Sequence, residues 1–158
     1  MIGTDVSEFV TTLEANAAEF AELVVSFPPE ARLEPFGDEF CAVEHACHLR
    51  DLERDGFTAR VRSVIEEEDP VLYNFDGGAA AAASHYRAQD ALDAINAFLE
   101  ARKRNINALS AVPEAGFLRI GHYEGRAPIT LAAVVTGMIE HDNDHLGRLR
   151  AMLAKTAF

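Results

Sequence analysis

The sequence predicts an all-α protein whose helices form a four-helix bundle. Apolar residues recur at intervals of three and four in four long segments, so each segment has one apolar helix face. Proline or glycine separates one segment from the next, and no clear sheet pattern accompanies them. Four amphipathic helices without a sheet are expected to pack as an antiparallel-type bundle. The 158 residues are expected to form a single domain over 1–158.

The first helix is expected from Asp5 to Phe27. Asp5 and Glu8 have the spacing of a capping box, and Pro28-Pro29 ends the segment. Its apolar face comprises Val6, Phe9, Val10, Leu13, Ala17, Phe20, Val24 and Phe27.

The next two helices are expected over residues 41–67 and 79–110. Asp69-Pro70 and Asp76-Gly77-Gly78 mark the connection between them. The third helix begins in the alanine run 79–83, because alanine has the highest helix propensity. Its apolar face comprises Leu92, Ile95, Leu99, Ile106 and Leu109.

The segment before the last helix has no clear helical periodicity. Residues 117–122, followed by Glu124-Gly125, are compatible with a short hairpin. Pro128 and Thr130 then open the fourth helix, which carries the final motif of the chain.

The charge balance argues against two classes of partner. The formal net charge is -12 and the sequence pI is about 4.8, so the surface repels nucleic-acid phosphates and anionic lipid heads. No nucleic-acid or membrane partner is therefore expected. Residues 1–6 lack the features of a signal peptide. Cys41 and Cys47 are spaced too far apart on one helix for a disulfide, and a cytoplasmic location is expected.

The last helix carries a pair of histidines suited to metal binding. His141 and His145 are four residues apart, so both rings lie on one helix face and can reach the same ion. His145 falls within the apolar stripe and His141 borders it. A buried imidazole needs a partner, and a metal ion is one such partner.

The third ligand is expected from the second helix, where periodicity does not choose between His45 and His48. On the helical wheel, His48 falls almost opposite the main apolar stripe, which favours an exposed position, and His45 is no better placed. A catalytic metal site needs a third protein ligand and an open position. Spacing alone leaves the choice open.

Two strings resemble the motifs of the DinB-like, or YfiT-like, superfamily. The first is Phe40-Cys-x-x-Glu44-x-x-x-His48-Leu49-x-Asp51-x-Glu53, and the second is Thr130-Leu131 followed by His141-Asp142-x-x-His145-Leu146. Between them, further residues occur in an order similar to the third helix of the family: Tyr86, Asp90, Ala91-Leu92, Phe98 and Arg102. Phe40 replaces the usual tryptophan, and Cys41 replaces the serine or threonine that caps the helix, which predicts a weaker cap.

The resemblance implies an up-down-down-up bundle, often homodimeric, that holds a divalent metal. Carried over to this chain, the ligands are His48, His141 and His145. Zinc or nickel is the expected ion, with iron or manganese as further candidates, since imidazole suits several of these metals.

Several carboxylates near these histidines are candidates for supporting roles. Glu44 is a candidate general base at the metal site, or else a helix-start charge favoured by the macrodipole. Asp51, Asp142 and Asp144 are candidates to orient a ligand imidazole. Arg102 is expected in a buried ion pair with a glutamate of the bundle.

The resemblance implies a metal-dependent enzyme acting on a small molecule. It supports a hydrolase or a transferase that uses a low-molecular-weight thiol, and the sequence does not choose between them. The alternative is a non-catalytic, stress-related bundle that binds a metal or small ligand and acts through its dimer surface.

Overall fold

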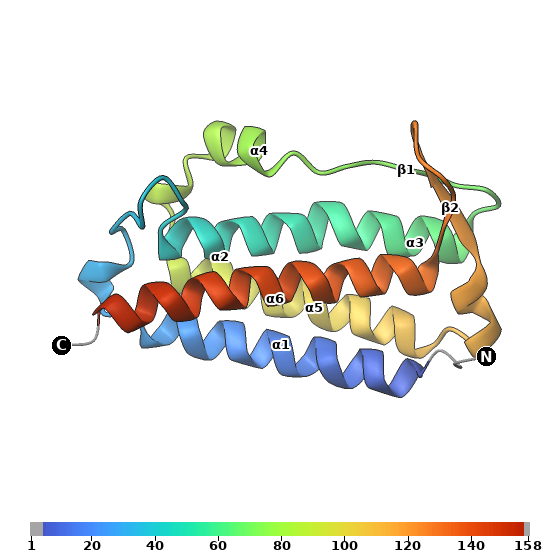
Figure 1. Cartoon of the computed structure of the whole chain (residues 1–158), viewed down its shortest axis with the longest axis horizontal. Coiled ribbons are helices and arrows are strands. Elements are labelled where there is room, and N and C mark those ends of the chain that lie inside the picture. The colour runs from blue at the N-terminus through green and yellow to red at the C-terminus, as the bar shows by residue number, and fades with distance from the viewer. Residues whose placement is uncertain (1–4, 157–158) are drawn as a thin grey trace.

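The long helices of the protein lie side by side as rods (Figure 1). A computed structural model describes residues 5–156, and it confirms the predicted four-helix bundle. The predictions of a single domain and of no signal peptide include residues 1–4 and 157–158, which lie outside the described residues. The rods are α1 (Val6–Ser26), α2 (Ala42–Asp51) with α3 (Thr58–Glu66), α5 (Ala91–Ser110) and α6 (Leu131–Thr156).

The rods run up, down, down and up. In Figure 1, α1 and α6 run in one direction, while α2–α3 and α5 run in the other. Because α3 and α5 run the same way, the chain must return along the whole bundle between them. Residues 67–90 make this return, through strand β1 (Val71–Leu72), helix α4 (Gly77–Ser84) and a 3₁₀ turn (Tyr86–Ala88).

The prediction of one continuous third helix from Ala79 is wrong. The alanine run lies in α4, which ends at Ser84, and His85 adopts the left-handed conformation with φ 49°. The next helix, α5, starts only at Ala91, where the Asp90 side chain accepts a 2.9 Å hydrogen bond from the backbone N–H of Asp93. High alanine propensity favours a helix but does not determine where it ends, and the Asp90 cap supplies a new start.

The predicted hairpin before the last helix is confirmed. Strand β2 (Ile120–Tyr123) pairs antiparallel with β3 (Ile129–Thr130). Strand β1 pairs in parallel with the edge of β2 that faces away from β3, which gives a three-stranded sheet. The sequence did not predict this strand, because its pairing joins segments far apart in the chain. The Thr130 hydroxyl accepts a 3.1 Å hydrogen bond from the backbone N–H of Ala133, which caps the start of α6 as predicted.

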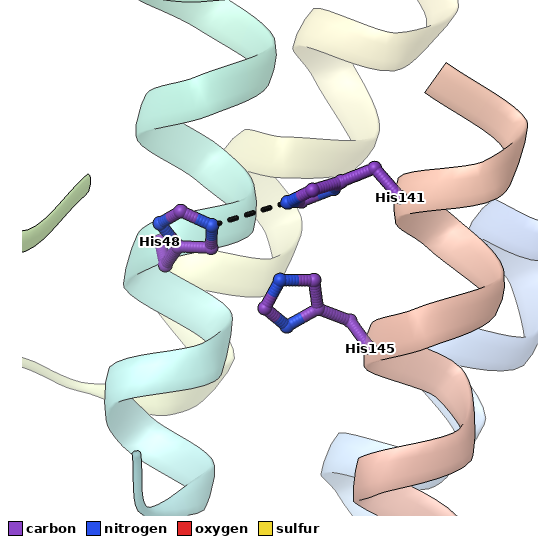
Figure 2. Close-up of side chains that lie close together, drawn as sticks. All are labelled: His48, His141 and His145. Atoms are coloured by element: carbon purple, nitrogen blue, oxygen red, sulfur yellow. Dashed lines mark hydrogen bonds between the residues drawn. The ribbon is translucent and has the colours of Figure 1, made fainter. Parts of the chain in front are cut away.

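A π-helical turn over Leu52–Phe57 joins α2 to α3. Each hydrogen bond in such a turn encloses one residue more than in an α-helix, which shifts the faces on its two sides by about 100°. A wheel drawn through the whole segment therefore mixes two registers. The exposed position that it favours for His48 is wrong, because this half-buried ring points from α2 toward α6 (Figure 2).

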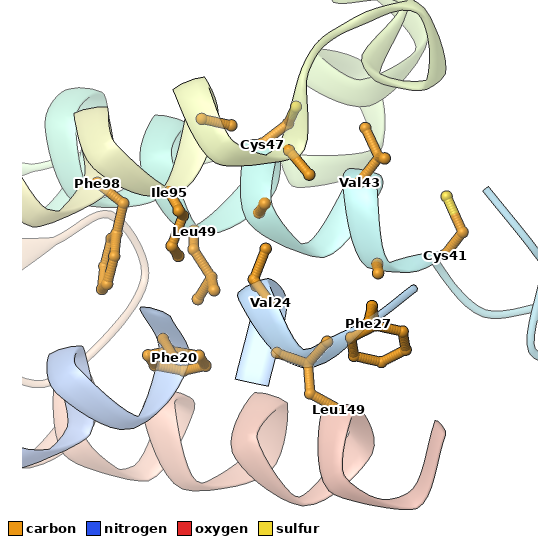
Figure 3. Packing of buried hydrophobic residues seen from close by; sticks show 14 of the residues in the cluster. Phe20, Val24, Phe27, Cys41, Val43, Cys47, Leu49, Ile95, Phe98 and Leu149 are labelled. Atoms are coloured by element: carbon orange, nitrogen blue, oxygen red, sulfur yellow. The ribbon is translucent and has the colours of Figure 1, made fainter. Parts of the chain in front are cut away.

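The apolar core is divided into two clusters along the bundle. The first lies between α1, α2, α5 and the end of α6, and Figure 3 shows the aromatic rings of Phe20, Phe27 and Phe98 within it. Cys41 and Cys47 are buried there as free thiols, in agreement with the prediction that they form no disulfide. The second cluster surrounds Val61, Leu109 and Met138 toward the other end. Across residues 5–156, no helix is long and apolar enough to cross a membrane.

Candidate metal centre

A layer of polar side chains separates the two apolar clusters. Each rod contributes at least one buried member: Asn16 from α1, Glu53 from the π turn, Arg102 and Asn105 from α5, and Asp142 from α6. Buried polar groups are tolerated when they satisfy one another. This layer lies at the level of the histidines, because Asp142 directly follows His141 in α6.

Three histidines converge between α2 and α6. His48 projects from α2, and His141 and His145 project from successive turns of α6 toward it (Figure 2). One ring nitrogen from each residue lies within 4.8 Å of the other two. The Nε2 atoms of His48 and His141 are 3.3 Å apart. A tetrahedral ion with metal–nitrogen bonds near 2.0–2.1 Å separates its ligands by about 3.3–3.4 Å, so this spacing fits a shared ion.

The environment keeps these rings neutral, as metal ligands must be. Burial, reinforced by the neighbouring histidines, lowers the pKa of His145 to about 2 and that of His141 to about 4. Burial also lowers the pKa of His48. Neutral imidazoles present lone pairs, and a cation placed between them satisfies all three at once. The donor set therefore fits a divalent ion.

Aromatic rings surround the cluster on several sides. Phe40 and Phe75 lie near the ring of His48, with centroids 5.6 Å and 6.3 Å away, and Phe57 lies 6.1 Å from His141. Such a shell restricts the access of water to the site, which lowers the local dielectric constant and strengthens electrostatic interactions there. Phe40, which departs from the family's tryptophan, therefore keeps an aromatic wall in place.

The structure distinguishes the two candidate third ligands. His48 belongs to the converging group, whereas His45 lies behind it, with 1% of its surface exposed. The Nδ1 of His45 is 2.9 Å from the Nδ1 of His145. Sequence reasoning weighed His45 only as a ligand and did not detect this contact. The one feature of the sequence that pointed to His45 was its position three residues before His48, which places the two side chains near each other on the helix.

The three predicted orienting carboxylates are occupied elsewhere. Asp51 accepts hydrogen bonds from Arg50 and from the Tyr86 hydroxyl, at 2.7 Å and 2.6 Å. Asp144 is exposed and pairs with Arg148 at 3.2 Å. Asp142 belongs to the polar layer, where it pairs with Arg102. None of these carboxylates forms a hydrogen bond with a ring of the cluster in the part of the chain that the structure describes.

Arg102 is the centre of the polar layer. Its guanidinium donates to Glu53 at 2.7 Å and to Asp142 at 2.8 Å, which confirms the predicted ion pair with a bundle glutamate and adds a second carboxylate. Asn16 also donates to Asp142, at 3.1 Å, and Asn105 donates to Glu53 at the same distance. Burial opposes the charge on Arg102, but the two carboxylates outweigh this effect and raise its pKa.

Glu44 lies at the start of α2, where it has structural partners. Its carboxylate accepts a 3.2 Å hydrogen bond from the backbone N–H of Cys41 and lies 3.3 Å from the guanidinium of Arg87. This is the arrangement of a capping box, in which the residue at the third helical position supports the cap. A role as general base stays a prediction.

Comparison with known proteins agrees with the fold and the motifs. A family model described as the DinB superfamily matches residues 12–149. The chain belongs to the DinB superfamily. Among solved structures, YfiT from Bacillus subtilis is similar, with a TM-score of 0.88 and 16% sequence identity, over 99% of this chain and 90% of that one. YfiT is described as a probable metal-dependent hydrolase with an unusual four-helix bundle topology. No curated protein matches the chain.

Membership of the DinB superfamily accounts for the arrangement of the rods. The matched region includes most of α1 and all of α2, α3 and α5, and it extends through His141 and His145 in α6. At 16% identity, the likeness to YfiT establishes the shared fold. We therefore infer metal binding from the geometry of this chain's own histidines.

Proposed function

We propose that this DinB-superfamily protein is a metal-dependent hydrolase in which His48, His141 and His145 hold one divalent ion. The observation that carries the proposal is the convergence of one ring nitrogen from each of these three histidines within 4.8 Å. Three protein ligands leave a coordination position open, as in catalytic zinc sites. Zinc or nickel is the expected ion, and iron or manganese are further candidates.

The chain's own residues define what such a site can do. A bound divalent ion supplies a Lewis acid and lowers the pKa of a bound water. The phenylalanines around His48 and His141 exclude bulk water and favour a small substrate with an apolar part. Arg102 is not available to bind a substrate carboxylate, since two protein carboxylates already occupy it.

The name of the structural neighbour supports hydrolysis over the second candidate. YfiT is described as a probable metal-dependent hydrolase. The second candidate is a transferase in which the ion binds a low-molecular-weight thiol, and a non-catalytic metal-binding bundle is the third. These alternatives use the same three histidines, so they are outcomes of the same assays.

Metal analysis is the first test. The purified protein should contain one divalent ion per chain, or take up one when zinc or nickel is added, and its melting temperature should rise because the ion binds the folded state. His48→Ala and His145→Ala should lose the ion yet stay helical, since packing stabilises the bundle. His85→Asn is the matched control: His85 is exposed, and asparagine tolerates its left-handed backbone.

Activity assays then separate the candidate functions. Cleavage of small ester or amide substrates without added thiol, lost in His48→Ala and kept in His85→Asn, supports the hydrolase. Conjugate formation that requires a low-molecular-weight thiol supports the transferase instead. A chain that binds no ion and gains no thermal stability from zinc, nickel or manganese contradicts metal dependence.

Two further expectations accompany this proposal. The family resemblance implies a homodimer, which sedimentation of the purified protein measures directly. The acidic composition favours a small-molecule partner over nucleic acid or membrane, and the cytoplasmic location stays a prediction.

A further inference from the structure

His45 is a buried histidine that contacts the back of a ligand ring. It lies on α2, one turn before His48, with 1% of its surface exposed. Its Nδ1 is 2.9 Å from the Nδ1 of His145, and the two rings are nearly perpendicular. We infer that His45 orients His145 for metal binding, a role that rests on the metal site proposed above.

The direction of this hydrogen bond determines whether His145 can bind an ion. A neutral imidazole carries one proton, on either Nδ1 or Nε2. If His145 holds its proton on Nδ1 and donates it to His45, its Nε2 lone pair is free to face the cluster. The opposite direction places the proton of His145 on Nε2, where it would block coordination.

His45 takes the position that a carboxylate or carbonyl oxygen usually occupies behind a metal-binding histidine. The nearby acidic residues on α6 are turned away, with Asp142 on Arg102 and Asp144 on Arg148. Within residues 5–156, the one side chain hydrogen-bonded to the Nδ1 of His145 is His45. The contact joins residues 100 positions apart, so it also ties α2 to α6 behind the cluster.

The other nitrogen of His45 is compatible with the same direction. Its Nε2 is buried and has no hydrogen-bond partner among the described residues. When His145 donates, the proton of His45 must lie on this Nε2, and the ring of Phe40 lies edge-to-face with His45 at a centroid distance of 5.7 Å. An aromatic face can accept a weak N–H contact. A buried nitrogen without a full hydrogen bond costs free energy, and the contact to His145 satisfies the other nitrogen of the ring.

Three substitutions at His45 test the inference. His45→Phe and His45→Leu both remove the acceptor nitrogen, and they replace the ring with apolar side chains of different shape. His45→Asn keeps it, because the asparagine side-chain oxygen can occupy the position of Nδ1. Zinc affinity is measured by competition titration, cobalt coordination by visible absorption, and the imidazole N–H of His145 by ¹H–¹⁵N spectroscopy of the zinc-loaded protein. Circular dichroism confirms folding, and His85→Asn is the control.

The expected result is a graded loss. His45→Phe and His45→Leu should bind zinc about 10–100-fold more weakly, still with one ion per chain. They should alter the cobalt spectrum and lose the protected N–H signal of His145. His45→Asn should restore affinity, spectrum and signal toward wild type. A purely structural role for His45 would not produce this recovery.

Other results overturn the inference in distinguishable ways. Unchanged zinc affinity in both His45→Phe and His45→Leu would show that His145 needs no orienting partner, while the metal site itself stands. Complete loss of zinc in His45→Asn, as in His145→Ala, would make His45 a ligand. A wild-type chain that binds no zinc, nickel or manganese defeats the proposed function and this inference together.

Discussion

The ring of His48 lies directly against the backbone of Gly77, the first residue of α4. A methyl group at Gly77 would lie 2.6 Å from Cε1 of His48 and 2.8 Å from its Nδ1, closer than real contacts allow. Helix α4 has no buried residue, yet its first residue contacts a ring of the candidate metal centre. The returning segment between α3 and α5 therefore covers one side of this centre.

We expect Gly77→Ala to weaken metal binding. The added methyl must displace either the His48 ring or the start of α4, and small displacements of a ligand are costly at a metal site. Gly78→Ala is the matched control, because its methyl would meet only a carboxylate oxygen of Asp76 at 3.5 Å, an ordinary contact. Zinc titration of both variants measures the difference. Equal affinity in the two variants would contradict this prediction.

Arg102→Met should strongly destabilise the fold. Arg102 is the cation shared by two carboxylates that are 1% exposed, so its loss leaves two buried negative charges facing each other. We expect a loss of about 3–5 kcal/mol in the free energy of unfolding, measured with urea. Arg150→Met is the control, since its ion pair with Glu19 is solvent-exposed and such pairs contribute about 0–1 kcal/mol.

Glu53→Gln should cost less than Arg102→Met. The group of Arg102, Glu53 and Asp142 carries one positive and two negative charges, so the glutamine variant leaves a balanced pair. The amide can still accept a hydrogen bond from the guanidinium. Urea unfolding should rank wild type, Glu53→Gln and Arg102→Met in order of falling stability. The reverse order for the two variants would refute the charge argument.

The metal-free protein should lose stability as the pH falls below about 6.5. Burial lowers the pKa of His45 and of His141 to about 4, lowers that of His145 further, and also lowers that of His48. These folded-state values lie below the unfolded value, so the unfolded chain takes up protons first and acid favours unfolding. The stabilising contribution is complete above the unfolded pKa and declines toward the folded one.

Urea unfolding of chelator-treated protein between about pH 7 and pH 5 measures this dependence, in a range above the titration of most carboxylates. The stability of His145→Phe should depend less steeply on pH than that of wild type. The substitution removes one titrating ring, and it also removes the repulsion between that ring and the other histidines when they are protonated. A profile that is flat in the wild type would contradict the prediction.

Thr130→Ala should destabilise the start of α6. The threonine hydroxyl accepts from the backbone N–H of Ala133, and loss of such a cap costs about 0.5–2 kcal/mol. Thr136→Ala is the matched control, since that hydroxyl donates to Ala132 within the same helix and the residue is exposed. We expect a change within about 0.5 kcal/mol there. Thermal or urea unfolding compares the two.

Local regularities let the sequence alone predict much of this protein. The helical periodicity defined the four rods. The spacing of His141 and His145 placed both rings on one face of α6, because residues four apart in an α-helix are neighbours. The proline and glycine signals before Thr130 predicted the hairpin and the start of α6, both confirmed.

Local rules failed at the end of α4 and at the orientation of α2. The break after Ser84 depends on the left-handed His85 and the Asp90 cap, which interrupt a run of strong helix formers. Helix α2 is covered by α5, by α4 and by the Tyr86–Ala88 turn, so it has buried residues around most of its circumference and a single apolar stripe could not place His48. In that case the family motif, and not periodicity, indicated the residue that the structure brings to His141.

The sequence by itself determined which segments are helical and which histidines share a face of α6, because hydrogen bonds within a few residues fix both. Only the tertiary structure decided that His48 joins that pair while His45 lies behind it. These contacts join residues 93 and 100 positions apart, and no local pattern encodes which face of α2 will meet α6. The packing of the rods sets that orientation.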